Sequence, residues 1–434
     1  MVEHSRRNFI YTAAAALAVN SAKPLRGADD KVSLAIIGLG GRGKDHMQEY
    51  AGLADARITA VCDVNQAALE RGQALVQKLT GVKPKGYSDM RQVFDDKEIQ
   101  AVSMPLPNHW HALATIWACQ AGKDVYIEKP ACHNPWEGQK MVEAARKYKR
   151  MVQVGSQSRS MAHKMKAIEL LHQGVIGKVY MAKGLCFKRR PSIGHKPDSP
   201  VPPGLDWDKF LGPAPMRPFN ELRFAYNWHW FWDTGNGDIG NQGVHEMDVA
   251  RWGLGRDLPN GVVSTGGKFV YNDDQETPNT QIATFDYGDA ELVFEVRGIF
   301  TGSEGNLPIG GHNTVGNLFF GSDGWMSLDE TGYRIYKSTE TTPSVTEKNT
   351  GKGDAAPHMQ NFLTAVRSRN WKDLNAEVQI GVTSADLCHF ANISYRLKRS
   401  LQVDPASGRF PTDNEANAML TQKYRAPYVV PEVV

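Results

Sequence analysis

The sequence has few cysteines, little net charge and no long apolar run. Only five of its 434 residues are cysteine, and they lie at positions 62, 119, 132, 186 and 388. Their number is odd and no two form a C-x-x-C pair, so the spacing indicates neither a disulfide framework nor a zinc site. No apolar stretch approaches the roughly 20 residues that span a bilayer. We therefore expect no metal site and no membrane span.

The charges nearly balance, with 50 Lys and Arg against 47 Asp and Glu and a net charge of +3. No basic stripe points to a nucleic-acid partner. The hydrophobic fraction of 41% is ample for packed cores and excludes a disordered or fibrous chain. At about 150 residues per domain, the length predicts two or three domains.

The first thirty residues have the pattern of an export signal. Arg6 and Arg7 precede a short apolar stretch from Tyr11 to Val19, which is too short to cross a membrane. The paired arginines resemble a twin-arginine signal, and the alternative is a frayed N-terminal helix. We expect residues 1–30 to be a signal peptide and the protein to be periplasmic or otherwise exported.

Residues 31–157 alternate short β runs with helical patterns. Strands are predicted at 32–37, 57–62, 101–104, 124–127 and 151–154, and helices around 68–79, 109–121 and 136–149. This alternation is typical of an α/β fold with a doubly wound parallel sheet, that is, a Rossmann domain.

Residues 158–434 have a different pattern. After a helix at 162–173 and a strand at 178–187 comes a segment rich in Pro, Gly, Trp and Arg at 188–236, which we call the aromatic excursion. Long loops are usually functional or disordered, and the aromatic content favours an ordered one. Further strands are predicted at 261–271, 280–287, 290–299, 317–320 and 333–337, and helices at 357–369 and 376–398. We expect a second α/β domain with an open, mostly antiparallel sheet.

A glycine-rich turn joins the first predicted strand to a helix. Gly38, Gly40 and Gly43 form G-x-G-x-x-G, a pattern in which they provide a tight turn, close approach to a pyrophosphate and close helix packing. Gly41 and Arg42 lie at the helix N-terminus, whose free N–H groups favour an anion. The turn therefore predicts a dinucleotide site.

Asp63 follows Gly43 by twenty residues, at the end of the second predicted strand. A carboxylate there accepts hydrogen bonds from both ribose hydroxyls and repels a 2′-phosphate, so it favours NAD over NADP. Arg42 and Asn65 leave NADP open.

Other polar residues end strands of the same sheet, where ligands of such folds bind. Glu128 and Lys129 precede Pro130 after the strand 124–127, and Asn108 and His109 follow the strand 101–104. We place these four, together with Gln157 after the last strand, among the cofactor-binding residues.

The chain resembles the glucose–fructose oxidoreductase/inositol dehydrogenase family (Gfo/Idh/MocA) over about residues 31–400. Three motifs in sequence order carry the resemblance: the glycine-rich turn, Pro107-Asn108-His109 and Glu128-Lys129-Pro130. The resemblance implies a bound nicotinamide cofactor, a carbohydrate substrate, and an open sheet that forms the substrate wall and often an oligomer interface. It also implies that Lys129 contacts substrate and nicotinamide ribose.

The resemblance places a catalytic histidine at His245, since the pKa of histidine suits a general base. The family commonly has an aspartate four positions earlier, where this chain has Asn241. Asparagine orients a hydroxyl but cannot accept a proton, so we take Asn241 as substrate-binding. Asp238 is a candidate for the missing carboxylate, at a different spacing.

Within the aromatic excursion, Trp228 and Trp232 could stack on a sugar ring, and Arg190 could bind its hydroxyl groups. The alternatives are that the two tryptophans form the core of the excursion and that Arg190 is a solvated loop residue.

We therefore expect an NAD-dependent oxidoreductase of a sugar or polyol hydroxyl that keeps its cofactor tightly bound and forms a homo-oligomer through the second sheet. One alternative is a redox-neutral glycosidase that acts through a transient keto-sugar. Another is a non-catalytic protein that binds a sugar or a cofactor.

Overall fold

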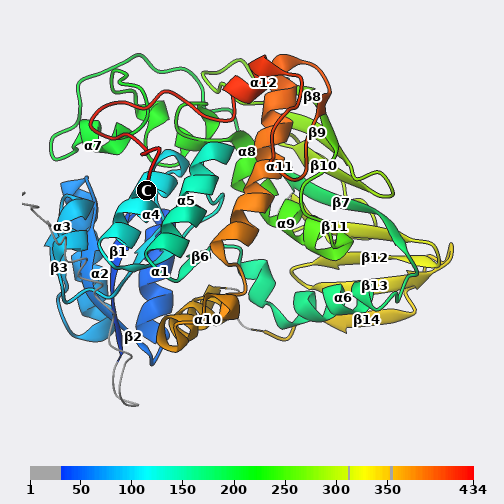
Figure 1. Cartoon of the computed structure of the whole chain (residues 1–434), viewed down its shortest axis with the longest axis horizontal. Helices are drawn as coiled ribbons and strands as arrows, with labels where there is room; N and C mark the ends of the chain where they lie inside the picture. Colours follow the sequence, from blue (N-terminus) through cyan, green and yellow to red (C-terminus); the bar gives the residue numbers. More distant parts are fainter. Residues whose placement is uncertain (1–30, 311–312, 352–354) are drawn as a thin grey trace, which may run out of the picture.

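The computed structural model describes residues 31–310, 313–351 and 355–434. The expected export signal lies outside the described residues. Two sheets stand side by side, and helix α11 (Val378–Leu397) lies between them (Figure 1). The first sheet belongs to the expected Rossmann domain and the second to the expected substrate domain.

The first sheet confirms the predicted doubly wound fold. Within the described ranges it has six strands in the order β3-β2-β1-β4-β5-β6, all paired in parallel. The strands are β1 (Val32–Ile37), β2 (Ala56–Cys62), β3 (Lys85–Tyr87), β4 (Ala101–Met104), β5 (Asp124–Ile127) and β6 (Val152–Val154). β3 was missed because it is a short edge strand whose side chains are mostly exposed, so it has no apolar pattern.

Helices cover both faces of this sheet, as expected for a central strand such as β1 that is buried throughout. They are α1 (Gly41–Gly52), α2 (Gln66–Thr80), α3 (Met90–Asp95), α4 (His111–Gln120) and α5 (Pro135–Lys147). Local sequence sets their ends: the side chain of Asn65 accepts two backbone N–H groups at the start of α2, and Gly81 ends α2 in the left-handed conformation.

The second sheet is open and mostly antiparallel, as predicted. In the described part of the chain it has nine strands in the order β14-β13-β12-β11-β7-β10-β9-β8-β15, and only β7 and β10 pair in parallel. The strands are β7 (Val179–Lys188), β8 (Gly261–Gly267), β9 (Thr280–Asp286), β10 (Glu291–Arg297), β11 (Asn313–Gly321), β12 (Gly324–Asp329), β13 (Gly332–Lys337), β14 (Val345–Lys348) and β15 (Leu401–Gln402).

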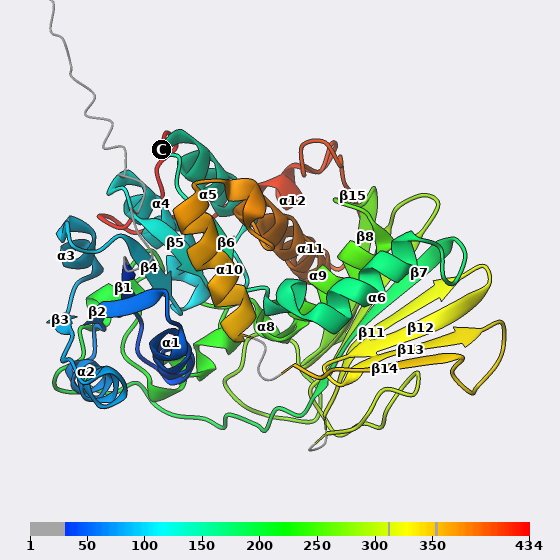
Figure 2. The same ribbon diagram turned by 90° about the horizontal axis from the view of Figure 1, so that it is seen from below.

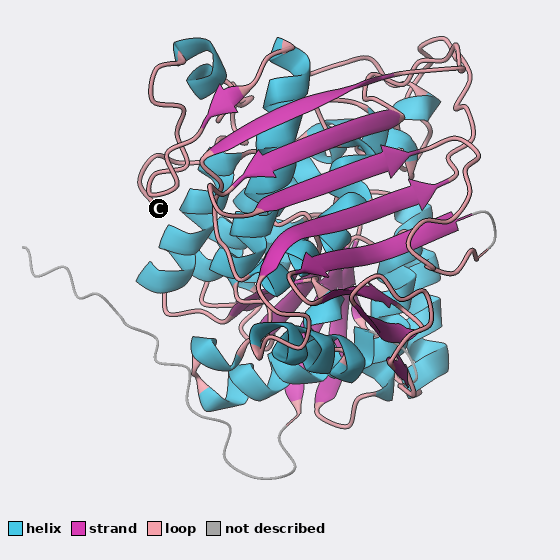
Figure 3. Cartoon of the chain, turned by 90° about the vertical axis from the view of Figure 1, so that its right-hand side faces the viewer, coloured by secondary structure: helices cyan, strands magenta, loops and turns pink. Residues whose placement is uncertain are grey.

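Helices cover one broad face of this sheet, and the other face is open (Figure 3). The helices that follow β6 in the chain are α6 (Ala162–His172), α7 (Trp207–Leu211), α8 (Gly237–Asn241), α9 (Gly243–Leu254), α10 (Ala355–Ser368), α11 and α12 (Asn414–Ala418). Short 3-10 helices lie at η1 (Asn108–Trp110), η2 (Gln157–Ser160), η3 (Glu221–Arg223), η4 (Asn227–Trp230) and η5 (Trp371–Asp373). α8 and α9 follow one another directly, divided at Gln242.

The boundary at residue 157 separates the sheets but not all the helices. α10 packs beside α1 over the first sheet (Figure 2), and its Met359 and Phe362 share a core with Ile36. α11 contacts α5 and β6 of the first domain as well as β8 and α9 of the second. Among the described helices, none is both long and apolar enough to cross a membrane.

The close packing of α1 on β1 yields a test of the glycine-rich turn. A Cβ atom on Gly43 would lie 2.1 Å from the carbonyl oxygen of Gly38, whereas one on Gly52 would meet no atom within 4 Å. We expect Gly43→Ala to lower the free energy of unfolding by about 1–3 kcal/mol, because a backbone atom must move. Gly52→Ala, at the other end of α1, is the matched control and should leave it unchanged or slightly higher. Chemical denaturation measures both, and equal stabilities would contradict the packing argument.

Candidate functional site

The glycine-rich turn forms a cradle for a pyrophosphate at the start of α1. Gly38 has φ +93°, which favours glycine, and Gly43 packs on its carbonyl group. Cβ atoms on Gly40 and Gly41 would point into open space. The first turn of α1 leaves backbone N–H groups without helical partners. This part of the chain therefore fits the diphosphate of a dinucleotide.

Asp63 is held next to this cradle, at the end of β2. Its carboxylate accepts backbone N–H groups from Leu39 and Asn65, each at 2.8 Å. Burial raises the pKa of Asp63, and the two N–H groups oppose the rise. Each oxygen keeps a lone pair for a ribose hydroxyl, so the residue fits the predicted role.

Glu128 is the centre of a buried polar network. Its Oε1 atom accepts from Arg42 Nε at 2.9 Å, His46 Nε2 at 3.0 Å and Gln157 Nε2 at 3.0 Å. Burial opposes the ionisation of Glu128, but Arg42 and His46 outweigh it and hold its pKa well below the usual range. Arg42, Glu128 and Gln157, all expected at the cofactor, thus brace the strand end that carries Lys129.

Lys129 connects the two domains. Its Nζ atom donates a hydrogen bond of 2.9 Å to the backbone carbonyl of Asn241, at the end of α8. Burial lowers the pKa of Lys129 against the pull of Glu128, and the positive charges of Lys188 and Arg190 add to the lowering. The structure therefore brings Lys129 and Asn241 together, as the sequence predicts.

His245 lies in the first turn of α9, half-buried and close to Lys129. Burial lowers its pKa well below the ordinary value, and the positive charge of Lys129 lowers it further. The imidazole of His245 makes no hydrogen bond within the described ranges. A neutral, unpaired imidazole at this position can accept a proton.

The expected carboxylate partner, Asp238, is already paired. Arg190 binds it with two hydrogen bonds, 2.9 Å from Nε and 2.6 Å from Nη2, and Asp238 is only 3% exposed. Arg190 also donates to the hydroxyl of Tyr226 at 3.0 Å. The Nδ2 atom of Asn241 donates to the same hydroxyl at 2.9 Å. Arg190 and Asp238 thus act as a neutral ion pair that positions Tyr226 and Asn241.

The aromatic excursion adds a second neutral imidazole, that of His229. Burial lowers its pKa to about 3, and Lys129 and Arg190 contribute. Its Nδ1 atom lies 2.6 Å from the carbonyl oxygen of Tyr226, so Nδ1 carries the hydrogen and Nε2 is the free acceptor. The ring of Trp228 stacks on it with centroids 3.6 Å apart.

The two tryptophans expected in the pocket, Trp228 and Trp232, lie in different surroundings. Trp228 lies at His229 and at the core of the excursion. Trp232 packs instead against Tyr395, with Arg396 over its ring at 5.1 Å. Only Trp228 therefore lies beside the group around Lys129.

Asn108 and His109 anchor the second domain to the first. Asn108 Nδ2 donates to Asn236 Oδ1 at 2.8 Å. The ring nitrogens of His109 face the carbonyl oxygens of Phe210 at 2.9 Å and Thr234 at 3.4 Å, and burial lowers its pKa to about 3. Both side chains therefore form hydrogen bonds within the chain itself.

One part of the excursion, residues 202–211, lies over the loop that follows Asp63; we call it the strap. Asn65 and Leu205 form an antiparallel bridge, Gln66 N donates to Gly204 O at 2.8 Å, and Asp206 N donates to Val64 O at 3.0 Å. The strap therefore covers the chain beside the predicted ribose site.

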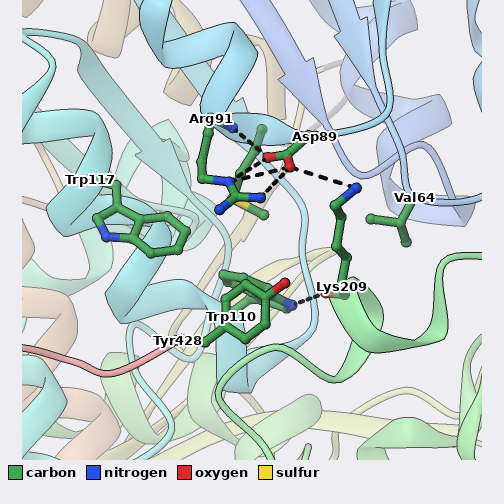
Figure 4. A pocket seen from close by; sticks show the side chains of 8 residues that line it. Val64, Asp89, Arg91, Trp110, Trp117, Lys209 and Tyr428 are labelled. Carbon is green, nitrogen blue, oxygen red and sulfur yellow. Dashed lines mark hydrogen bonds and ion pairs between the residues drawn. The ribbon is translucent and has the colours of Figure 1, made fainter. Parts of the chain in front are cut away.

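A small pocket opens next to the strap (Figure 4). Its lining residues come from the first domain, the strap and the C-terminal tail: Val64, Asp89, Met90, Arg91, Trp110, Trp117, Lys209 and Tyr428. Asp89 holds its rim together, bound by Arg91 at 2.6 Å and by Lys209 at 3.6 Å. Neither Lys129 nor His245 lines it.

Sequence reasoning missed His46, Tyr226, His229 and Gln242. Gln242 accepts a hydrogen bond of 3.0 Å from Lys188 Nζ, and Tyr226 joins Arg190 to Asn241. The run Tyr226-Asn227-Trp228-His229 could have indicated two of them. Nothing in the sequence near His46 indicates that it binds Glu128.

Comparison with known families decides the relationship. The family model described as "Oxidoreductase family, NAD-binding Rossmann fold" matches residues 32–156. A second family model, described as "Oxidoreductase family, C-terminal alpha/beta domain", matches residues 142–289 and 325–430. The chain belongs to the Gfo/Idh/MocA oxidoreductase family. Its first domain is thus an NAD-binding domain, as predicted, and the cradle and Asp63 are the residues that would hold the cofactor.

Individual relatives are more distant. Inositol 2-dehydrogenase of Salmonella paratyphi B is 31% identical over 151 residues, 34% of this chain and 44% of that protein. A "Glycosyl hydrolase family 109 protein" of Shewanella sp. is 25% identical over 154 residues, 35% of this chain and 34% of that protein. The chain thus matches less than half the length of these curated relatives.

Among solved structures, the WlbA dehydrogenase from Bordetella pertussis, in complex with NADH and UDP-GlcNAcA, shares the fold with a TM-score of 0.64. It is 19% identical, and the match covers 86% of this chain and 99% of that one. At this identity the likeness concerns the fold alone.

The position of Asp63 predicts the choice of cofactor. Asp63→Ala removes hydrogen bonds from a carboxylate to the ribose hydroxyls, which should weaken NADH binding about 10- to 100-fold. Because the repulsion of a 2′-phosphate is also removed, NADPH should weaken less. Fluorescence titration with both nucleotides measures the ratio, and Glu70→Ala, an exposed carboxylate on α2, is the control. An unchanged NADH to NADPH ratio would contradict the assignment.

Proposed function

We propose that the chain is an NAD-dependent oxidoreductase that oxidises a hydroxyl group of a carbohydrate or polyol and holds its cofactor tightly. One observation carries the proposal: Lys129 of the NAD-binding domain reaches Asn241 of the second domain at 2.9 Å, beside the unpaired imidazole of His245. A donor and a base thus meet at the crevice where such folds bind their ligands.

When bound, NAD+ supplies the acceptor for a hydride from the carbon that bears the hydroxyl. Lys129 has three N–H donors, and Asn241 takes one, so two are free for the substrate oxygen. His245 takes the hydroxyl proton, because its lowered pKa keeps it neutral and the positive charge of Lys129 is close enough to polarise the hydroxyl. The imidazole of His245 thereby gains the hydroxyl proton while the carbon is oxidised.

The acceptors around this pair suit a polyhydroxylated substrate. The free Nε2 atom of His229 and the Oδ1 atom of Asn241, which has no partner among the described residues, can each take a hydroxyl proton in a hydrogen bond. Trp228 offers a ring face next to them. The name of one relative, inositol 2-dehydrogenase, supports the same substrate class.

Two observations support tight retention of the cofactor. The strap covers the chain beside Asp63, and the bond from Trp110 Nε1 to the carbonyl of Lys209, at 3.0 Å, fastens it to the first domain. The paired Arg6 and Arg7 support export by the twin-arginine route. Since free NAD is not expected outside the cytoplasmic membrane, an exported enzyme must keep and regenerate its cofactor. Native mass spectrometry that finds no bound nucleotide in purified protein would contradict this part of the proposal.

We also propose that the chain forms a homo-oligomer through the open face of the second sheet. Val263 and Ile282, on the neighbouring strands β8 and β9, are exposed apolar residues on one face of that sheet. Exposed apolar groups gathered on one sheet favour a protein interface. Light scattering measures the molar mass, and a monomer at micromolar concentration would contradict this interface.

The main test follows the absorbance of the bound nicotinamide while sugars, glycosides and polyols are added to the purified chain. We expect at least one to change it, and His245→Ala to slow that change about 100- to 10,000-fold, the usual contribution of a general base. The acid limb of the kcat/KM profile should lie below pH 6.5, because His245 stays neutral as the pH falls through the ordinary value.

Two variants control this test. His172→Ala removes an exposed histidine on α6 and should leave the rate unchanged. His229→Ala should raise KM more than it lowers kcat, because its imidazole only binds the substrate. If His229→Ala abolishes turnover and His245→Ala does not, the base is misassigned. If no compound changes the absorbance, the non-catalytic binding role replaces the oxidoreductase.

A second candidate is the redox-neutral glycosidase. The Shewanella relative, named "Glycosyl hydrolase family 109 protein", favours it, although that match covers only 35% of this chain. In such a reaction the enzyme oxidises a hydroxyl, uses the transient ketone to acidify the neighbouring C–H bond, eliminates the glycosidic substituent, and returns the hydride after water has added.

Solvent deuterium distinguishes the two candidates. In D2O the glycosidase incorporates deuterium at the carbon next to the oxidised one, because a base removes and solvent returns that proton. The dehydrogenase yields a keto-sugar without this label, because its reaction includes no elimination. NMR of the product from a glycoside substrate measures it: label with loss of the aglycone supports the glycosidase, and net ketone without aglycone release supports the dehydrogenase.

A further inference from the structure

Three side chains with different ligand atoms converge outside the site described above. Cys132 lies in the segment between β5 and α5, and Asp386 and His389 lie on adjacent turns of α11. The Cys132 Sγ atom is 3.6 Å from His389 Nε2, and one ligand atom of each residue lies within 4.8 Å of the others. The cluster joins the NAD-binding domain to the helix between the sheets.

One oxygen of the buried Asp386 carboxylate has no hydrogen-bond partner among the described residues. Asp386 is 8% exposed, and its Oδ1 atom accepts no hydrogen bond from any residue that the structure describes. A buried carboxylate oxygen without a hydrogen bond is costly and therefore rare in folded proteins. The positive charge of Arg251 favours the ionised form of Asp386 but does not outweigh the effect of burial. Cys132 and His389, which face it, are 0% and 3% exposed. A cation between the three groups would remove this cost.

We propose that Cys132, Asp386 and His389 bind a zinc ion. Thiolate, imidazole and carboxylate are all zinc ligands, and a thiolate disfavours magnesium and calcium. Zinc bonds of about 2.3 Å to sulfur and about 2.0–2.1 Å to nitrogen, at a tetrahedral angle, place these two atoms about 3.6 Å apart. The observed separation of Sγ and Nε2 is 3.6 Å. Water takes the fourth position, and the thiol proton passes to solvent on binding.

The proposed site differs from the expectation from sequence, which was no metal site because the cysteines form no C-x-x-C pair. The three proposed ligands come from two segments of the chain, and Cys132 and His389 are 257 residues apart in sequence. Sequence motifs for zinc sites do not include so long a spacing. Because Cys132 follows Lys129 by three residues, the ion would clamp the segment behind the catalytic lysine to α11. The proposal depends on neither the cofactor nor the sugar.

The test uses the full chain, stripped of metal by a chelator and titrated with Zn2+ and with Co2+ alone. We expect one equivalent of each per chain, a higher Tm with Zn2+, and a thiolate-to-cobalt charge-transfer band with Co2+. Cys132→Ser and His389→Gln should each weaken binding at least 100-fold and abolish the band. Cys119→Ser, which alters another fully buried thiol of the same domain, should keep both.

Three results would overturn the site. One is the absence of stoichiometric binding by the wild-type chain, which would leave a thiol–imidazole hydrogen bond as the explanation of the contact. The second is a cobalt complex without the thiolate band. The third is binding that persists in both ligand variants, which would place the ion elsewhere. The wild-type cobalt spectrum decides the question even if a variant fails to fold.

Discussion

The geometry of the candidate site depends on one buried carboxylate, that of Glu128. At 4% exposure its charge would be prohibitive without partners, and Arg42, His46 and Gln157 provide them from α1 and η2. These bonds hold the end of β5 against the helix that begins at the glycine-rich turn. The same network therefore fixes the position of the dinucleotide cradle and that of the backbone of Lys129 relative to each other.

Residues of the two domains meet at the candidate site because the chain crosses between its two domains several times. The strap and the bonds of Asn108 and His109 fasten the second domain to the first from one side. Helix α10 returns to cover the first sheet, and α11 fills the space between the sheets. Neither half carries Lys129 and His245 together, so the site and the domain contact are stabilised by the same burial.

Charge explains how the site functions without the aspartate that the family commonly has. The charge of the carboxylate that is present, Asp238, is neutralised by Arg190. The backbone carbonyl of Asn241 accepts a hydrogen bond from Lys129. Burial and the positive charges of Lys129, Lys164 and Arg42 lower the pKa of His245, and Glu128 only partly opposes them. This environment keeps the imidazoles of His245 and His229 neutral, which a proton acceptor requires and which a nearby carboxylate would oppose.

The sequence by itself determined what short-range patterns encode. Strand and helix periodicity predicted both sheets, apart from β3, β12, β14 and β15. β3 and β15 are short and β14 is exposed throughout, and in β12 the residues Gly324, Ser327 and Asp329 interrupt the apolar pattern. Spacing predicted the glycine-rich turn, Asp63 and Lys129, because each follows directly after a strand. Only the tertiary structure decided which polar groups pair: Glu128 with His46, Arg190 with Asp238, and Cys132 with His389. The physical reason is that such pairs join residues from 48 to 257 positions apart, and packing, not local sequence, brings them together.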